Sequence, residues 1–185
     1  PLRLVGSEMC IRDRSKPNTT GNDDGYEYVI RQVSSQIGDI QIQTPTPLHV
    51  DIVFLMKTGE CPSDELIAAV DAAVKNSAKK SLNDYITVNK PETVDYAINI
   101  KYYINESDRS KAAEIQKAVV EAVESYKQWQ SEKIGRDISP WKLIYHIIST
   151  GAKRVEIISP TATTIATGKV ANCTSQSVPV SYTHL

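Results

Sequence analysis

The sequence predicts an α+β fold of two small two-layer units, each with helices packed on a short sheet. Apolar residues alternate between helical and strand-like spacing along the chain. A helix-strand-corner-strand element also occurs twice. The chain has 185 residues, of which 41% are hydrophobic, so burial alone can stabilise one sizeable core or two small ones. We place the first unit at residues 22–90 and the second at residues 91–177.

The first unit is expected to begin with a helix over about residues 22–33, because acidic residues at its start are favourable for the helix dipole. A strand at 40–42 follows. Residues 44–47 read Thr-Pro-Thr-Pro and lack the Asn-Gly or Gly-Gly pair of a tight hairpin, so this segment either leaves the sheet or lies on its edge. The next strand, residues 50–56, is apolar on both faces, as in a strand covered on both sides.

The remaining elements follow from spacing and capping signals. Pro62-Ser63-Asp64-Glu65 opens a helix that we expect to end near Lys79 and Lys80. Apolar and polar residues then alternate over 94–104, which predicts a long half-buried strand. The other expected elements are a short strand at 85–88, a helix at 110–129, a short helix that starts at Pro140 and is stopped by Gly151, and strands at 155–158 and 165–174. In the helix that starts at Pro140, Ile144, Ile147 and Ile148 are expected to line the buried face.

The repeated element is visible when Ser34–Thr46 is aligned with Ser149–Thr161 without a gap. Pro45 then falls on Pro160, and both copies read helix, strand, hydroxyl-Pro-Thr corner, strand. Two copies indicate a duplicated architecture, and a catalytic loop would need different residues at each copy, so we interpret the corner as structural.

Both ends look foreign to the fold. Gly6–Arg14 (GSEMCIRDR) and Val180–Leu185 (VSYTHL) resemble translated sequencing-adapter peptides. We therefore assign residues 1–21 to an adapter-like end plus linker and residues 178–185 to a second adapter-like end. Neither segment is expected to contact the core, and the gene is expected to continue beyond both.

Charge and cysteine content exclude several classes of function. The formal net charge of −1 provides no general attraction to nucleic acid or to an anionic membrane. No apolar run approaches the roughly 18 residues of a membrane span. The three cysteines are far apart and have no zinc-site spacing. We expect no nucleic-acid partner, membrane span, metal or cofactor.

A search for catalytic groups also favours a protein that is not an enzyme. His49 and His146 have no plausible nucleophile beside them in the sequence, Cys61 has no positioned base, and Cys173 falls in a strand-like run. The acidic pairs at helix starts are explained by capping. An enzyme that uses His49 or Cys61 ranks below the other interpretations.

Two tryptophans are the candidate partner-binding residues. Trp129 and Trp141 flank the loop between the last two predicted helices, and large aromatic side chains are favoured anchors of protein interfaces. The alternative is that both are core residues.

Five stretches carry a resemblance to a known family. They are GYEYVIRQVSSQIGDIQIQTPTP, VDIVFLMKTGECPSDELIAAVDAAV, SLNDYITVNKPETVDYAINIKYYI, GRDISPWKLIYHIISTGAKRVEIISP and VANCTSQSV. From about Gly25 to Val178 the chain resembles the C-terminal part of the baseplate assembly protein J family. It departs from that family's pattern at Ser81, where proline is usual, and at Ala152, where a Gly-Val pair is usual.

The resemblance implies a non-enzymatic structural component of the baseplate wedge of a contractile phage tail or a related injection machine. It implies other baseplate wedge proteins as partners, several copies around the tail axis, a place in the virion tail baseplate, and assembly in the bacterial cytoplasm. It brings no catalytic residues. The alternative that the residues leave open is a small-molecule-binding regulatory module built from ferredoxin-like units.

Overall fold

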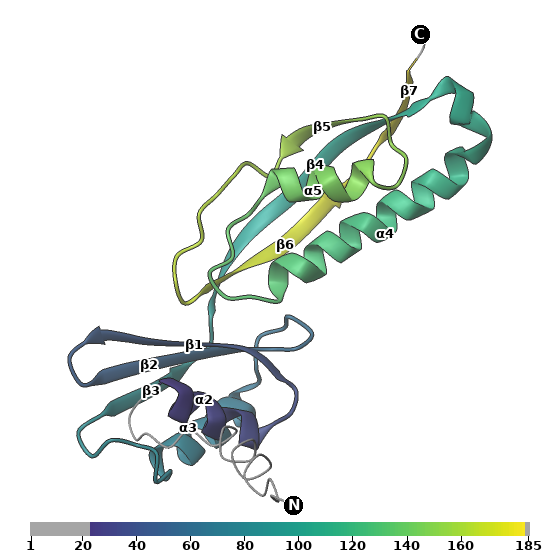
Figure 1. Ribbon diagram of the computed structural model, residues 1–185. Helices are drawn as coiled ribbons and strands as arrows, with labels where there is room; N and C mark the ends of the chain where they lie inside the picture. Colours follow the sequence, from purple (N-terminus) through teal and green to yellow (C-terminus); the bar gives the residue numbers. More distant parts are fainter. Residues whose placement is uncertain (1–22, 184–185) are drawn as a thin grey trace, which may run out of the picture. The chain divides into compact units, whose positions relative to one another are not determined.

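The computed structural model describes residues 23–183, which form two compact units (Figure 1). The first unit contains α2 (Asp23–Val33), β1 (Ile37–Thr46), β2 (His49–Met56), α3 (Asp64–Lys75) and β3 (Tyr85–Asn89). The second contains β4 (Glu92–Asn105), the 3-10 helix η1 (Glu106–Lys111), α4 (Ala112–Ser131), α5 (Pro140–Ile148), β5 (Arg154–Ser159), β6 (Lys169–Ser177) and β7 (Val180–Thr183). The predicted α+β class is confirmed.

The first unit is a three-stranded sheet covered on one face by two helices (Figure 1). The strand order is β1-β2-β3, with β1 and β2 antiparallel and β2 and β3 parallel, and α3 makes the crossover between the parallel pair. The core is formed by Tyr26, Ile30, Ile37, Val50, Ile52, Phe54, Val70, Val74, Ile86 and Val88.

Helix α3 starts where the sequence predicts and ends earlier. The Ser63 hydroxyl caps it by accepting a hydrogen bond from the backbone N–H of Leu66. The helix ends at Lys75 instead of continuing to Lys80, because the Ser77 hydroxyl accepts a hydrogen bond of 3.0 Å from the N–H of Lys79 and turns the chain.

The connection between β1 and β2 corrects one expectation. The strands form a tight hairpin in which Thr46 pairs with His49, so only Pro47 and Leu48 make the turn. Leu48 adopts a φ of 68°, a conformation found mostly at glycine. The ring of Pro47 fixes the φ angle of the other turn residue. Pro45 is accommodated because β1 lies at the sheet edge, one of the two placements expected for it.

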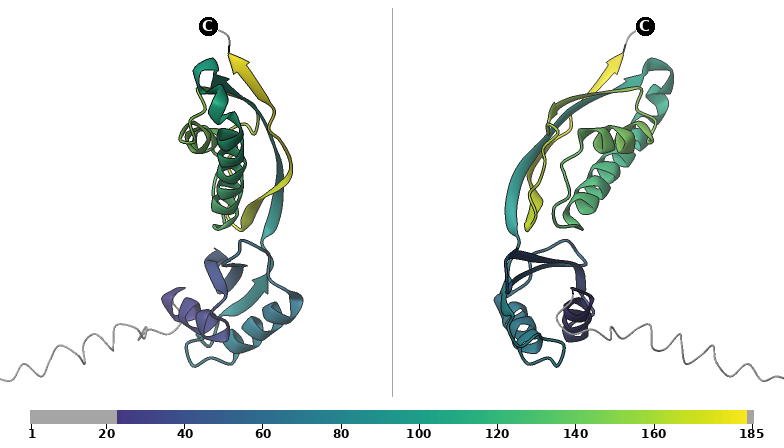
Figure 2. Two further views of the ribbon diagram at one scale, coloured as in Figure 1. Left: turned by 90° about the vertical axis from the view of Figure 1, so that its right-hand side faces the viewer. Right: turned by 60° about the vertical axis from the view of Figure 1, so that its left-hand side comes forward.

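The second unit is built on β4, a strand of 14 residues. It pairs with β5 in antiparallel fashion on one side and with β6 and then β7 in parallel on the other. Both α4 and α5 lie on the same face of this sheet (Figure 2). Among residues 23–183, no helix is both long and apolar enough to cross a bilayer.

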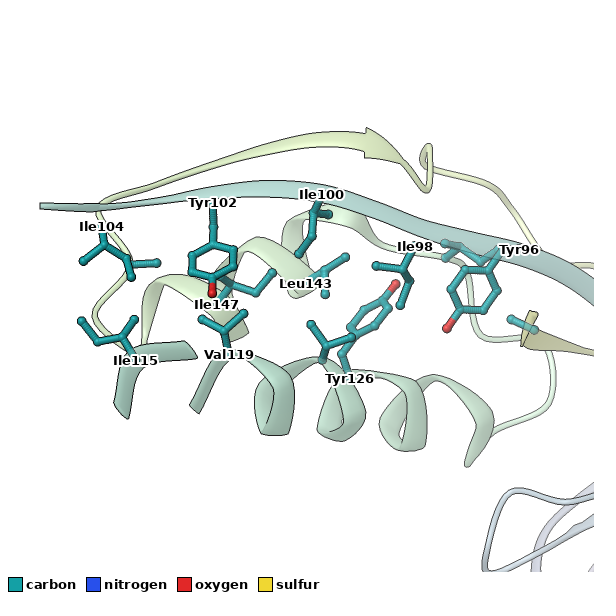
Figure 3. Packing of buried hydrophobic residues seen from close by; sticks show 14 of the residues in the cluster. Tyr96, Ile98, Ile100, Tyr102, Ile104, Ile115, Val119, Tyr126, Leu143 and Ile147 are labelled. Atoms are coloured by element: carbon teal, nitrogen blue, oxygen red, sulfur yellow. The ribbon is translucent and has the colours of Figure 1, made fainter. Parts of the chain in front are cut away.

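Alternation along β4 creates the core of this unit. Every second side chain of the strand points at the two helices, which supply the opposing apolar residues (Figure 3). The main contributors are Tyr96, Ile98, Ile100, Tyr102 and Ile104 from β4, Ile115, Val119 and Tyr126 from α4, and Leu143 and Ile147 from α5.

The predicted repeat holds for its first half only. A helix followed by a strand occurs in both units, as α2-β1 and α5-β5. The corner and the next strand differ, because β1 and β2 pair with each other whereas β5 and β6 lie on opposite sides of β4. Pro45 is exposed within β1, while Pro160 is buried in the connection after β5 and follows a cis peptide bond. The two corners are therefore not equivalent, and a duplicated architecture is not supported.

The expectation that the C-terminal segment avoids the core is wrong for Val180–Thr183. These residues form β7, which pairs with Tyr102–Asn105 of β4, and Val180 packs against the core. Strand β4 extends beyond the end of β6, which leaves an edge that residues of high β propensity can join. Gly6–Arg14 lies outside the described residues.

Two adjacent isoleucines of α5 test this packing. Ile147 is fully buried and Ile148 is 48% exposed. Replacing Ile147 with alanine should lower the free energy of unfolding by about 2–5 kcal/mol, because it leaves a cavity. Ile148→Ala should cost less than about 1 kcal/mol. Chemical denaturation followed by tryptophan fluorescence measures both; equal losses would contradict the observed orientation of α5.

Candidate partner interface

The tryptophans selected from the sequence lie on α4 and α5, and the connection between these helices decides how each is presented. Helix α5 begins at Pro140 after Ser139, whose hydroxyl accepts a hydrogen bond of 3.4 Å from the N–H of Lys142. This cap with proline at the first helical position fixes where the helix starts. The start of α5 in turn fixes which of its residues point away from the core.

A buried glutamine holds the connection in place. The Gln130 side chain is fully buried, and its Nε2 donates to the carbonyl oxygens of Arg136 at 2.8 Å and Asp137 at 3.2 Å. The Asp137 carboxylate accepts a hydrogen bond of 2.8 Å from the N–H of Ile165. Since the buried amide of Gln130 needs hydrogen-bond partners, these bonds favour one loop conformation. Sequence reasoning missed Gln130, which has no pattern that distinguishes it from the other polar residues of α4.

Trp129 is half-buried and packs against the core of the second unit. Its ring centroid is 6.0 Å from that of Tyr126, and the Arg136 guanidinium lies 4.1 Å from the ring. The Lys142 ammonium is 5.4 Å from the same ring and 5.3 Å from the ring of Tyr145. Cations at these distances are attracted to aromatic faces. Trp129 thus links α4, the loop and α5.

Trp141 lies on the other side of α5 and is 75% exposed. Tyr145 and Ile148 follow it at intervals of four and three residues, so all three share one helical face, and they are 67% and 48% exposed. We call these three residues the α5 ridge. The buried face consists of Leu143 and Ile147, so the expectation that Ile148 lines the core is wrong. The spacing of the ridge was readable in the sequence, although Tyr145 was not selected from it.

His146 lies next to the ridge without the surroundings of a catalytic base. Its ring centroid is 6.5 Å from that of Tyr126 and 6.1 Å from that of Tyr145, and Nε2 is buried without a hydrogen-bond partner. Partial burial, with a smaller contribution from Lys142, lowers the pKa of His146 below its ordinary value. The neutral ring is therefore favoured as a packing residue.

The other candidate reactive residues each have different surroundings. His49 is exposed and stacks on Tyr85 with 5.3 Å between ring centroids, and Cys61 is an exposed free thiol. Cys173 is half-buried, its Sγ lies 3.5 Å from the carbonyl oxygen of Ser175, and burial raises its pKa. Within the described part of the chain, no three His, Cys, Asp or Glu side chains gather in a way that could hold a metal ion.

The paired carboxylates lie at helix N-termini, as the capping interpretation requires. Asp23 and Asp24 occupy the first turn of α2, and Asp64 and Glu65 occupy that of α3. Asp64 also forms a salt bridge of 2.7 Å with Lys90. These positions are favourable for negative charge without any catalytic role.

Comparison with known proteins identifies first the fold and then the family. A solved baseplate chain of the anti-feeding prophage (AFP), determined by cryo-EM and 6-fold symmetrised, shares this fold at a TM-score of 0.58 and 11% identity. The match covers 90% of this chain and 40% of that one. Two family models match in succession, the Baseplate J-like central domain at residues 18–90 and the Baseplate J-like protein C-terminal domain at residues 96–178. The chain belongs to the baseplate J-like family. No curated protein matches it.

The lowered pKa of His146 predicts a pH effect. Because the unfolded chain takes up a proton near pH 6.5 and the folded chain resists it, stability is present above that pH and is lost as the pH falls through the lowered folded pKa. Thermal unfolding at pH 7.5 and 5.5 should show a smaller decrease in melting temperature for His146→Phe than for the parent. An identical decrease would exclude His146 as a contributor.

Gln130 should matter for both stability and the environment of Trp129. Gln130→Ala leaves two loop carbonyls without their donor and should lower the free energy of unfolding by about 1–3 kcal/mol. Gln128, exposed on the same helix, provides the matched control Gln128→Ala. In a Trp141→Phe background, Trp129 is the single tryptophan, so a fluorescence shift in the Gln130 variant alone would report the displaced loop.

Proposed function

We propose that this chain is part of a structural component of the baseplate wedge of a contractile phage tail or a related injection machine. It acts by protein-protein assembly and without catalysis. The observation that carries the proposal is the succession of central and C-terminal baseplate J-like domains along one chain. The fold shared with the AFP baseplate chain supports it.

The partners in this proposal are other baseplate wedge proteins, with several copies of the chain around the tail axis. Assembly takes place in the bacterial cytoplasm before the component reaches the virion tail baseplate. The 6-fold symmetry named for the AFP baseplate supports a repeated arrangement of this kind. The chain spans 40% of the matching AFP chain, so these statements concern the whole protein of which the two domains are a part.

The cavity between α4 and β6 does not favour the small-molecule-binding alternative. A cavity of about 390 Å³ lies between α4 and β6, where polar side chains bond one another. Lys127 pairs with Glu124 at 3.0 Å, and Gln176 donates to the same carboxylate at 3.1 Å. A ligand site needs polar groups that converge on a space and remain available to the ligand. This cavity does not have that arrangement.

The partner surface in this proposal includes Trp129 and Trp141, with different roles. Trp141 is exposed and supplies an aromatic anchor, the residue type that interfaces favour. Trp129 is half-buried and supports the surface from below through the Arg136 and Lys142 cations. We therefore expect Trp141 to contribute mainly to binding and Trp129 mainly to folding.

Incorporation into particles tests the proposal. In the full-length protein, Trp141→Ala should reduce the amount bound to purified particles at least about tenfold while the melting temperature stays within about 2 °C of the parent. Trp129→Ala should instead lower the free energy of unfolding by about 2 kcal/mol, because it removes packing from the core. Mass spectrometry of particles and thermal melts of the isolated proteins provide both measurements. Complete, infective particles that lack the wild-type protein would refute the baseplate role.

A further inference from the structure

Helix α5 is apolar on nearly all sides although it lies at the surface of its unit. Its sequence is PWKLIYHII, in which only Lys142 and His146 are polar. Leu143 and Ile147 bury one face against β4 and α4, and the α5 ridge of Trp141, Tyr145 and Ile148 occupies the opposite face. A helix that is apolar all round is normally covered on both sides. Its outer face thus has the composition of a buried surface.

The spacing of the ridge matches the way in which helices recognise one another. Side chains four and three residues apart form a continuous ridge that fits the groove of a second helix. Trp141 and Tyr145 are also residue types that dominate interface energies. A partner that adds a strand to a sheet edge pairs with backbone groups. The ridge, by contrast, presents only side chains, which suits a helix.

The charge on helix α5 itself has one sign. Helix α5 carries no carboxylate, and Lys142 lies on the flank of the ridge with its ammonium 5.3 Å from the Tyr145 ring. The Arg136 guanidinium, on the Trp129 ring, adds a second cation to the same aromatic group. The Asp137 carboxylate, in the loop before α5, accepts a hydrogen bond from the backbone N–H of Ile165, so it is engaged within the unit. Complementarity therefore favours a partner with negative charge next to an apolar stripe.

We propose that the α5 ridge, flanked by Lys142, is the docking site for an acidic amphipathic helix of another baseplate protein. The helix lays its apolar face on Trp141, Tyr145 and Ile148 and places a carboxylate against the Lys142 ammonium. This inference rests on the proposed function and deepens it, because it states which surface is used and the chemistry of the segment that binds there.

Trp129 and Arg136 act as positioning residues for this site. The Lys142 ammonium is shared between the Trp129 and Tyr145 rings, and the Trp129 ring is held in turn by Arg136. Gln130 fixes the backbone of Arg136. The half-buried Trp129 ring and Arg136 therefore position the cation that meets the partner.

Matched substitutions in the full-length protein test the surface. Tyr145→Ala and Ile148→Ala should each reduce the amount in purified particles about fivefold or more, and Lys142→Glu should do the same through charge repulsion. Val120→Ala and Lys117→Glu on α4 are the controls, since Val120 is 52% exposed and Lys117 is 82% exposed. These controls should incorporate normally. Thermal melts confirm that each variant is folded.

Crosslinking identifies the occupant. A photoreactive benzoylphenylalanine at position 145 should crosslink, in assembled particles, to a helical segment of a different protein that carries Asp or Glu beside an apolar stripe. Reversal of the partner's carboxylate to lysine should then restore incorporation of Lys142→Glu. A crosslink to a second copy of this chain, or to a basic or extended segment, would overturn the inference.

The two proposals fail in different ways. Particles that contain the wild type and the folded ridge variants in equal amounts would overturn the ridge as a docking site and leave the baseplate role standing. Complete particles without the wild-type protein would overturn the baseplate role and the docking site with it.

Discussion

The second unit depends on strand β4, whose alternation fixes everything that packs around it. One face of the strand supplies five consecutive inward side chains, from Tyr96 to Ile104. The strand also pairs with β5 on one side and with β6 and β7 on the other. A shift of one residue would turn the whole apolar set to the opposite face. The register of β4 therefore determines where α4 and α5 can lie.

The orientation of α5 follows from that constraint and gives the unit its asymmetry. Leu143 and Ile147 must face β4, and the cap at Ser139 sets where the helix starts. Because the buried face and the helix start are both fixed, Trp141, Tyr145 and Ile148 point away from this core. Their exposure is a geometric consequence of how the buried face is satisfied. Alanine at Ile147 is therefore expected to lower stability, whereas alanine at the neighbouring Ile148 changes the exposed surface.

Periodicity made most of this fold predictable from sequence. The long alternation after Pro91 and the four-and-three spacing of the helices reflect burial directly, so the elements and their two-layer packing were recoverable. Pairing was not. The similarity of Ser34–Thr46 to Ser149–Thr161 reports local helix and strand preference, which is shared, and says nothing of which strand becomes the neighbour.

Two of the misjudged segments share one physical cause. Pro47-Leu48 closes a hairpin despite a side chain at positive φ, and Val180–Thr183 joins β4 despite its foreign appearance. In both cases pairing with a neighbouring strand outweighs the local signal, because hydrogen bonds and side-chain packing on a formed sheet stabilise conformations that isolated residues disfavour. A segment that lies beside a long unpaired strand edge has to be assessed for its ability to pair with that edge, as well as for its local sequence pattern.

The candidate interface shows which part of a site a sequence can reveal. Trp129 and Trp141 were recognisable as aromatic residues beside one loop, yet nothing in their identity separates the half-buried ring from the exposed one. That distinction depends on Gln130, which fixes the loop through two carbonyls, and on Arg136 and Lys142, which lie on the Trp129 ring. A polar side chain that bonds backbone carbonyls leaves no periodic trace in a sequence. The residues that meet a partner were therefore partly visible, while those that position them required the fold.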